Sequence, residues 1–361
     1  MTDRQTDRQT DRQTDRQTDR RKVYFDYLRV FATFAVMILH ISAQNWYSTD
    51  VNGFDWQIFN FFDSIVRWGV PVFVMISGSL FLNREISLSK IFSKYIRRLI
   101  TAFIAWSAIY AVFMDGTIVN RASALVQGHY HMWFILMIVG IYMCIPFIKV
   151  IAESDFRIKY FLILSFVFAF VFPEIFTLTK DFGNDLILKA SNIVSSDVNS
   201  MNMQMVLGYT CYFILGYYLD NKELNRRQRF IIYTLGIVGF VFTIVMDMIV
   251  ALKTQTYCGN YYGDFNVNIL FESIAVFTAF KYRTFEKEKI NTIIQKMSKF
   301  SFGAYCVHAL IIEQLNIRLG LNTLSFNSVF SVLSIGVIVF VVSFSISAIL
   351  NKIPIIRKYI V

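Results

Sequence analysis

The apolar stretch at residues 24–42, YFDYLRVFATFAVMILHIS, constrains the fold of this chain most strongly. It is long enough to cross a bilayer, yet it contains Arg29 and His40, eleven positions apart. On an α-helix this spacing returns to nearly the same face, with about 16 Å of rise between the two residues. Asp26 lies one turn before Arg29 and is close enough to pair with it. Ionisable groups inside a membrane helix are costly, and by default they mark a site in the protein interior.

Each of these residues also has a simpler explanation. Arg29 lies near one end of the helix, from which a long side chain can reach the lipid headgroups. His40 alone is explained as well by a satisfied structural histidine. The pair on one face, with Asp26 nearby, favours a functional interpretation, in which the helix carries one ionisable group near each membrane surface.

Composition indicates a membrane protein. Only 17% of the residues are charged and 55% are hydrophobic, with a mean hydropathy of +0.49, whereas soluble proteins have about 25% charged residues. The apolar residues form long runs and not short alternating segments, so the prediction is an all-α, polytopic helical bundle and not a β-barrel. The four cysteines are scattered singly, without the spacing of a metal site or a disulfide framework.

The hydrophobic runs predict about ten transmembrane helices. With the N- and C-termini in the cytoplasm, the inner loops and the C-terminal segment hold 21 Lys and Arg residues and the outer loops hold five. This positive-inside bias supports ten spans whose loops alternate between the two sides of the membrane. It also explains the net charge of +10 without a nucleic-acid partner. Arg29 then lies toward the cytoplasm and His40 toward the outside. The predicted spans are 23–42, 57–82, 95–114, 132–149, 160–178, 204–219, 230–251, 267–280, 300–317 and 328–350.

The N-terminus is a tandem repeat of Thr-Asp-Arg-Gln over residues 2–20. We expect residues 1–22 to form a disordered cytoplasmic tail, because the repeat has no apolar face, and residues 23–361 to form the membrane domain. One codon set for the repeat unit, ACA GAC AGA CAG, is the tetranucleotide ACAG repeated three times. Such a tract slips during replication, so we hypothesise phase-variable expression. The alternative is an ordinary low-complexity tail encoded by mixed codons.

Several residues in other predicted spans could carry chemistry. Arg67 lies in the outer half of the second span and needs a partner there. Pro71 and the Ser77-Gly78 pair predict a bent helix with close packing, for which helix packing alone is a sufficient reason. His308 in the ninth span is an intramembrane histidine that fits a structural role as well as a functional one.

The polar residues at the start of the fourth span, and the basic residues at the start of the third span, each have two possible roles. His129 and His131 could bind a metal, but without further ligands nearby we expect no metal site, and Trp133 is typical of an interfacial anchor. The basic residues of the third span serve the positive-inside rule, or they hold the phosphates of a cytoplasmic cofactor. These basic residues are Lys94, Arg97 and Arg98.

Four segments together resemble the acyltransferase 3 family of integral-membrane O-acyltransferases. Asp26-Tyr27-Leu28-Arg29 followed by His40 resembles the D-x-L-R…H signature of that family. The other three segments resemble its motifs in the second, fourth and ninth spans, in the right order, and the resemblance covers residues 22–350. Lys94-x-x-Arg97-Arg98 departs from the usual Arg-x-x-Arg followed by proline. The three further segments are 71–78, 131–134 and 301–308.

The resemblance implies transfer of an acyl group, usually acetyl from acetyl-CoA, to a hydroxyl of a surface or envelope glycan such as lipopolysaccharide. It also implies a multi-pass protein of the bacterial cytoplasmic membrane, in the form without an added hydrolase-like domain. Acyl-CoA carries phosphates that suit a basic inner mouth at Arg29 and the third-span cluster. His40 suits a general base for the acceptor hydroxyl, and Arg67 or His308 suits oxyanion stabilisation.

The competing interpretation is a transporter or flippase of lipid-linked sugars, in which the same charged residues would line a pathway. No inverted repeat or pair of broken helices supports it. A non-catalytic structural protein explains neither the placement of Arg29 and His40 nor the series of motifs. The acceptor sugar, the acyl group and the oligomeric state stay open at this stage.

Overall fold

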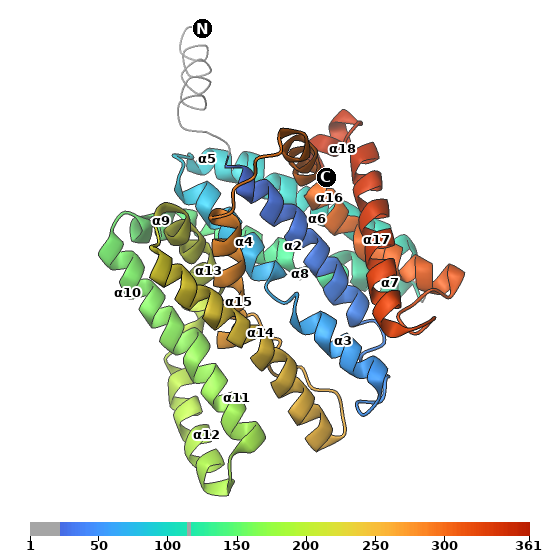
Figure 1. Cartoon of the computed structure of the whole chain (residues 1–361). Helices are drawn as coiled ribbons and strands as arrows, with labels where there is room; N and C mark the ends of the chain where they lie inside the picture. Colours follow the sequence, from blue (N-terminus) through green and yellow to red (C-terminus); the bar gives the residue numbers. More distant parts are fainter. Residues whose placement is uncertain (1–21, 114–116) are drawn as a thin grey trace.

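The computed structural model describes residues 22–113 and 117–361, and all regular structure in these ranges is helical. Figure 1 shows the helices assembled into one bundle, and the predicted all-α fold is confirmed. The repeat tail predicted for residues 1–22 lies, apart from Lys22, outside the described residues. Within the described ranges, seven segments are long and apolar enough to cross a membrane, so the protein is a multi-pass membrane protein. They are Val23–Ser42, Phe54–Leu82, Leu88–Phe113, Ile118–Met143, Asp155–Phe182, Arg226–Thr254 and Ser328–Leu350.

The other three predicted spans are also helical, but they are shorter or more polar than these seven. They correspond to α13, α15 and α16, and the count of ten and the orientation of the termini stay predictions. The helices are α2 Val23–Ser42, α3 Phe54–Ser64, α4 Gly69–Leu82, α5 Leu88–Lys90, η1 Ile91–Ile96, α6 Arg97–Phe113, α7 Ile118–Gln127, η2 Tyr130–Met132, α8 Trp133–Met143, α9 Ile145–Ala152, α10 Asp155–Ser165, η3 Phe166–Val171, α11 Phe172–Phe182, α12 Asp185–Ser200, α13 Gln204–Asn221, α14 Arg226–Thr254, α15 Val267–Lys281, α16 Glu288–Leu319, α17 Ser328–Leu350 and α18 Pro354–Tyr359.

Helix α2 is the central element of the bundle, and it packs against α3, α4, α15, α16 and α17. Its apolar residues recur around the whole helix, so most of its surface is buried, including Leu28, Ala32, Met37 and Ile41. A helix this deeply buried fixes the positions of any polar side chain it carries. We name the two ends of the bundle the Arg29 end and the His40 end after the two residues on this helix.

The second hydrophobic span is broken into α3 and α4 by a turn at residues 65–68. Pro71 has no N–H to donate to the carbonyl of Arg67, and its ring crowds that carbonyl, so the helix cannot run continuously through this point. The bend predicted from Pro71 is therefore present and lies just before Gly69. The indole of Trp68 donates a hydrogen bond to the freed carbonyl of Ile65 at 2.8 Å.

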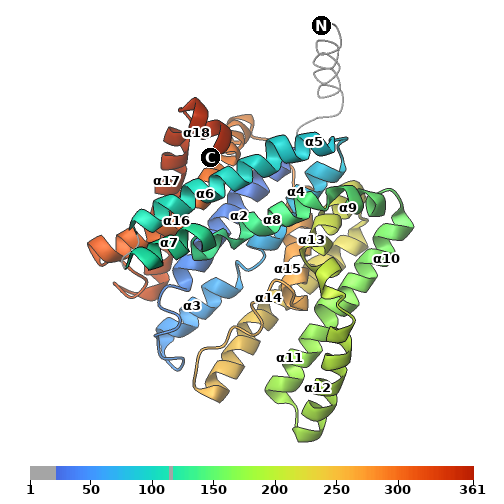
Figure 2. The same ribbon diagram turned by 180° about the vertical axis from the view of Figure 1, so that it is seen from behind.

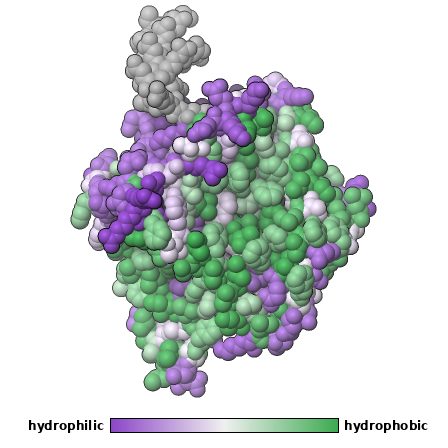
Figure 3. All heavy atoms as spheres, in the orientation of Figure 1, coloured by the Kyte–Doolittle hydropathy of each residue, from purple (hydrophilic) through white to green (hydrophobic). Residues whose placement is uncertain are grey.

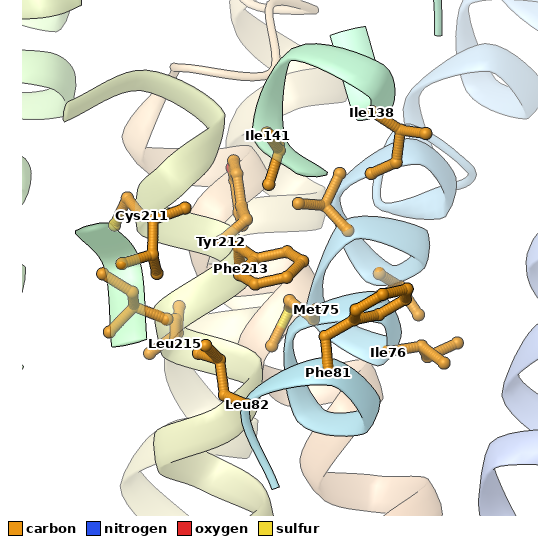
Figure 4. Close-up of a cluster of buried hydrophobic side chains, with 14 of the residues drawn as sticks. Met75, Ile76, Phe81, Leu82, Ile138, Ile141, Cys211, Tyr212, Phe213 and Leu215 are labelled. Carbon is orange, nitrogen blue, oxygen red and sulfur yellow. The ribbon is translucent and has the colours of Figure 1, made fainter. Parts of the chain in front are cut away.

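Helices α4 and α13 pack with their backbones almost in contact. A Cβ built on Gly78 would lie 1.7 Å from the carbonyl oxygen of Phe213, and one built on Gly216 would lie 2.0 Å from that of Met75. Figure 4 shows the side chains of Met75 and Phe213 between the two helices. The packing role predicted for Gly78 is thus confirmed, because only glycine permits this approach.

The outer surface has the distribution expected of a membrane protein. Figure 3 shows a broad hydrophobic zone between two hydrophilic ends. Figure 2 shows that α11 and α12 extend as a separate arm, and no residue of α12 is buried. Most of the polar segment between the fifth and sixth predicted spans is the helix α12, which begins with an Asn184 cap.

Candidate functional site

A cavity of about 550 Å³ lies at the Arg29 end. Its walls come from α2, α4, α6, α8, α16 and α18, so it is formed by segments far apart in the sequence. Its lining includes four cationic side chains: Arg29, Arg98, Lys299 and Arg357. Such a concentration of Arg and Lys in one cavity suits a ligand that carries phosphates.

Only one residue of the third-span basic cluster lines this cavity. Arg98 is half-buried, donates to the carbonyl oxygen of Val361 at 2.5 Å, and lies over the Phe302 ring at 5.7 Å. Arg97 is exposed and lies 5.6 Å from the Tyr359 ring, and Lys94 is exposed beside Tyr95. The π-helical turn η1 precedes Arg97 and offsets the helical register of this segment.

Asp26 is buried on α2, at 2% exposure, one turn before Arg29. Arg29 itself is half-buried and contributes to the cavity wall. The carboxyl group of Asp26 and the guanidinium of Arg29 are thus both carried by the first turns of the central helix. The structure places both predicted residues at the same end of the bundle.

Tyr305 on α16 connects this cavity to a second site. Its ring lines the cavity, and the same ring lies 5.3 Å from the ring of His131 and 5.8 Å from that of His308. The Tyr305 hydroxyl donates to the carbonyl oxygen of His131, while the Tyr305 carbonyl accepts a hydrogen bond from Nδ1 of His308. One buried tyrosine therefore separates the cationic cavity from a group of histidines.

All four histidines of the chain meet at this point. The ring of His40 on α2 stacks against that of His308 on α16, with 5.2 Å between centroids. The ring of His131 lies 4.9 Å from that of His308 and 6.3 Å from that of His40. His129 completes the group, since its Nδ1 lies 3.0 Å from Nδ1 of His131. We call these four residues the histidine cluster.

The backbone before α8 positions two members of the cluster. Gly128 ends α7 with a φ of +74°, a conformation that favours glycine, and a Cβ there would lie 2.8 Å from the Phe103 ring. The chain then enters η2, which points His131 into the protein interior. A residue other than glycine at position 128 would therefore move the two histidines that follow it.

Tyr110 on α6 holds the other side of the cluster. Its ring stacks on His129 at 4.1 Å between centroids. Its hydroxyl donates to the carbonyl of Cys306 at 2.9 Å and accepts from the amide of Leu310 at 3.0 Å. These two groups flank His308 on α16, so Tyr110 fixes the helical turn that carries this histidine.

The hydrogen bonds determine the tautomers of the buried histidines. A carbonyl oxygen only accepts, so Nδ1 of His308 carries the proton and Nε2 of the neutral ring is a bare lone pair. His129 Nε2 lies 2.8 Å from Oε1 of Glu313 and donates to it, so the Nδ1 of neutral His129 accepts from His131. Nε2 of neutral His131 is then also a lone pair. Neither Nε2 atom has a hydrogen-bond partner within the described ranges.

Among the three stacked or adjoining rings of His40, His131 and His308, that of His40 is the most accessible. It is half-buried, whereas His131 and His308 are buried at 2% and 0% exposure. Its ring also lies 5.1 Å from that of Tyr130, which is 54% exposed. A substrate that reaches the histidine cluster from the His40 end meets His40 before it meets the two buried rings.

Arg67 has the partner that its position requires. Its Nη2 lies 2.6 Å from Oδ2 of Asp63, and its guanidinium lies 4.1 Å from the centre of the Tyr262 ring. The Tyr262 hydroxyl in turn donates to Asn60. This group, which we call the Arg67 network, lies outside the histidine cluster. The sequence identified Arg67 but not Asp63, one turn earlier on α3.

Asp264 lies close to the Arg67 network, in the loop between α14 and α15. Its Oδ2 accepts a hydrogen bond from the Tyr209 hydroxyl at 2.6 Å. Burial raises the pKa of this carboxyl to about 6, although the Tyr209 hydrogen bond and the charge of Arg67 act in the opposite direction. Trp133 is 43% exposed and its ring lies 5.8 Å from that of Tyr209.

Several residues of the two sites were not identified from the sequence. Lys299 and Arg357 line the cavity, but in the sequence they look like ordinary positive-inside residues. Glu313 and Tyr110 support His129, but no motif marked them. The sequence assigns no catalytic role to His129 or His131, although His131 lies in the fourth-span motif. In the described part of the chain, no group of three or more His, Cys, Asp or Glu side chains could hold a metal ion.

These features define a multi-pass helical membrane protein with a cationic cavity joined to a buried histidine cluster. Comparison with known families identifies its class. The sequence model of the acyltransferase 3 family, described as an acyltransferase domain, matches residues 22–351. The chain belongs to this family and is a membrane acyltransferase, as its four motifs indicate. No curated protein and no solved structure gave a significant match to the chain.

Proposed function

We propose that the protein moves an acetyl group from acetyl-CoA, bound at the Arg29 end, to a hydroxyl of an envelope glycan bound at the His40 end. The observation that carries this proposal is the connection through Tyr305, whose ring lines the cationic cavity and contacts His131 and His308. The thioester of an acyl donor and the proton-accepting group have to lie next to each other, and Tyr305 lies where the cavity adjoins the histidines.

The cationic and the apolar residues of the cavity lining both support this donor. The nucleotide part of CoA carries phosphates, which Arg98, Lys299 and Arg357 can neutralise. Arg29, on α2, is the fourth cationic side chain of the cavity lining. Phe73, Phe134 and other apolar residues supply a surface for the pantetheine arm. With the Arg29 end in the cytoplasm of a bacterial inner membrane, as the positive-inside bias predicts, acyl-CoA has direct access to the cavity.

The transfer itself requires removal of one proton. The acceptor oxygen attacks the thioester carbonyl while a ring nitrogen of His40 takes the hydroxyl proton. The resulting tetrahedral intermediate collapses, the carbon–sulfur bond breaks, and the CoA thiolate leaves and takes up one proton from the solvent, which balances the proton that His40 has accepted. The acetyl ester and free CoA are the products, so atoms and charge balance.

The other histidines suit the next step, in which His40 passes its proton on. The bare Nε2 atoms of His131 and His308 lie on rings next to His40, and each can accept a proton. From His131 the hydrogen bond to His129, and that of His129 to Glu313, continue to a partly exposed carboxylate. We propose that this row returns His40 to its neutral form between turnovers.

On the acceptor side we propose supporting roles for Arg67 and Trp133. Arg67 is held by Asp63, so it would present a fixed positive charge and would not act as a mobile donor. Trp133 presents an exposed aromatic face. Asp26 would act through Arg29 as a positioning residue, and Lys94 and Arg97, which face away from the cavity, would act only by attracting the anionic donor.

Mass spectrometry of surface glycans tests the proposal directly. Cells expressing the wild type, the His40→Ala variant or no protein are compared, with the amount of protein in the membrane measured for each. We expect glycans heavier by one acetyl group only with the wild type. Acetylation that persists in the variant would contradict the role of His40. No mass shift in any strain, together with altered glycan export, would point to a transporter.

We also propose that expression of the gene is phase-variable. The Thr-Asp-Arg-Gln repeat lies outside the described residues, so the support comes from the sequence, in which one tetranucleotide unit can encode the whole tract. Sequencing the tract from single colonies decides the matter. A pure ACAG tract with colony-to-colony changes in unit number supports switching, whereas mixed synonymous codons contradict it.

A further inference from the structure

A second cavity, of about 960 Å³, lies on the other side of α2. Tyr27 and Phe31, one turn apart on α2, form part of its wall. Arg29, between them in the sequence, lines the cationic cavity described above. The remaining walls come from the start of α14, the end of α15, the segment that follows α15 and the start of α16. The two cavities therefore have no lining residue in common, although α2 and α16 each contribute to both.

The floor of this second cavity is aromatic. The rings of Tyr27 and Phe285 stack at 4.0 Å between centroids, and Phe31 lies 5.3 Å from Phe280. The Tyr27 hydroxyl donates to Oδ1 of Asn291 at 2.9 Å, and Nδ2 of Asn291 donates to the carbonyl of Phe285 at 2.9 Å. These bonds fix the segment after α15, so the floor is formed in advance of any ligand.

The rim of the cavity is cationic. Arg229 is half-buried, with its guanidinium 4.5 Å from the centre of the Tyr282 ring. Arg283 and Lys287 are exposed at the same rim, and within residues 22–113 and 117–361 neither has an ion-pair partner. Glu286 is the single acidic residue in the lining, so the lining carries an excess of positive charge.

The position of the cavity identifies its occupant. It lies where two apolar helices, α2 and α14, begin, which is the level of the lipid headgroups. Phe31, at 47% exposure, and Ile290, at 43%, give it an apolar side toward the membrane. A basic pocket between transmembrane helices at headgroup level, with an apolar outlet, complements an anionic phospholipid.

We propose that this cavity binds one anionic phospholipid of the leaflet at the Arg29 end. The phosphate lies between Arg229, Arg283 and Lys287, and the acyl chains leave along Phe31 and Ile290. A bound lipid there would fix the side of α2 opposite Arg29. The proposal is independent of the acyl-transfer reaction, because it concerns a different cavity and a binding measurement.

Native mass spectrometry of the purified full-length protein tests this proposal. The protein, in a neutral detergent, is titrated with phosphatidylglycerol or phosphatidylcholine of the same chain length. We expect a preference for phosphatidylglycerol. Each basic side chain near an anionic headgroup contributes roughly a fivefold change in association, so the double variant Arg283→Gln/Lys287→Gln should lose about 25-fold for phosphatidylglycerol and little for phosphatidylcholine.

Two further variants separate the pocket from general surface charge. Arg226→Gln/Arg227→Gln removes two exposed charges from the same end of α14, outside the cavity lining, and should leave lipid binding within about twofold. Glu286→Gln removes the opposing charge and should strengthen phosphatidylglycerol binding about fivefold. Equal binding of both lipids, or an equal loss in the Arg226/Arg227 control, would overturn the proposal. So would displacement of the lipid by adenosine 3′,5′-bisphosphate, since the site would then bind the nucleotide.

Discussion

The cationic cavity and the histidine cluster lie on the two sides of Tyr305, and they differ in the kind of charge they can offer. The cavity carries guanidinium and ammonium groups, which stay positive at any physiological pH. The cluster consists of four imidazole rings, which can take up and pass on a proton through their ring nitrogens, with no Arg or Lys side chain among them. The difference suggests a division of labour, in which one region binds an anion and the other handles a proton.

The largest effect is expected from His40→Ala. Removing the accessible base should lower the rate of acetyl transfer by about 10²- to 10⁴-fold, while the affinity for acetyl-CoA stays unchanged. Radiolabelled acetyl transfer and equilibrium binding of the donor are measured on the same membranes. Tyr47→Phe, on an exposed side chain beyond the end of α2, is the control. A variant that keeps more than about a tenth of the rate would remove His40 from the mechanism.

A smaller effect with the opposite kinetic pattern is expected from Arg98→Gln. Loss of one charged hydrogen-bond partner should raise KM for acetyl-CoA roughly 10- to 100-fold, with little change in kcat. Arg97→Gln is the matched control, because the neighbouring arginine is exposed and does not line the cavity. Steady-state kinetics at varied donor concentration distinguishes the two variants. If Arg97→Gln raises KM as much as Arg98→Gln, the cavity is not the donor site.

Glu313→Gln tests whether the histidine cluster passes its proton to the Glu313 carboxylate. The amide oxygen can still accept from His129, but it provides no negative charge for a proton arriving along the row. We expect kcat to fall about tenfold and KM for the donor to stay constant. Gln314→Ala, at the next position of α16, is the control. An unchanged kcat would show that protons leave His40 by another route.

The smallest effect concerns stability, at a carboxyl that belongs to neither region. The pKa of Asp264 is raised to about 6 in the folded protein from an ordinary value of 3.8. The folded state therefore binds more protons than the unfolded state between these values, so its contribution to stability falls as pH rises from 4 to 6. Replacement by Asn should remove this pH-dependent contribution, which is on the order of 1–3 kcal/mol in the free energy of unfolding.

Thermal unfolding in detergent at pH 4, 5, 6 and 7 measures this effect. The difference in melting temperature between the wild type and Asp264→Asn should grow in favour of the variant as the pH rises. Acetyl transfer should be affected less than in His40→Ala, Arg98→Gln or Glu313→Gln, because Asp264 lies outside both the cavity and the cluster. A constant difference in melting temperature across the series would mean that Asp264 does not titrate in this range.

Much of the fold and part of the site could be predicted from the sequence. Long apolar runs gave the helical membrane bundle, because hydropathy and helical length are local properties. Helical periodicity placed Arg29 and His40 on one helix, and Pro71 and Gly78 predicted a break and a close contact that the structure contains. His308 was identified as an intramembrane histidine, and it stacks on His40.

The remaining parts depend on packing between distant segments. The histidine cluster combines α2, η2 and α16, so no spacing in the sequence brings His129 and His131 next to His308. The π-helical turn before α6 decides which of two neighbouring arginines enters the cavity, and a simple helical repeat does not capture it. Lys299 and Arg357 resemble any other positive-inside residue until the chain is folded.

The most direct test of the account combines donor binding and single-turnover transfer for His40→Ala and Arg98→Gln in the same proteoliposomes. The account predicts complementary defects: His40→Ala binds acetyl-CoA normally and transfers almost nothing, whereas Arg98→Gln binds weakly and transfers at a near-normal rate once saturated. If both variants lose binding and transfer together, with the protein folded and inserted, the cavity and the histidine cluster do not divide the work as proposed.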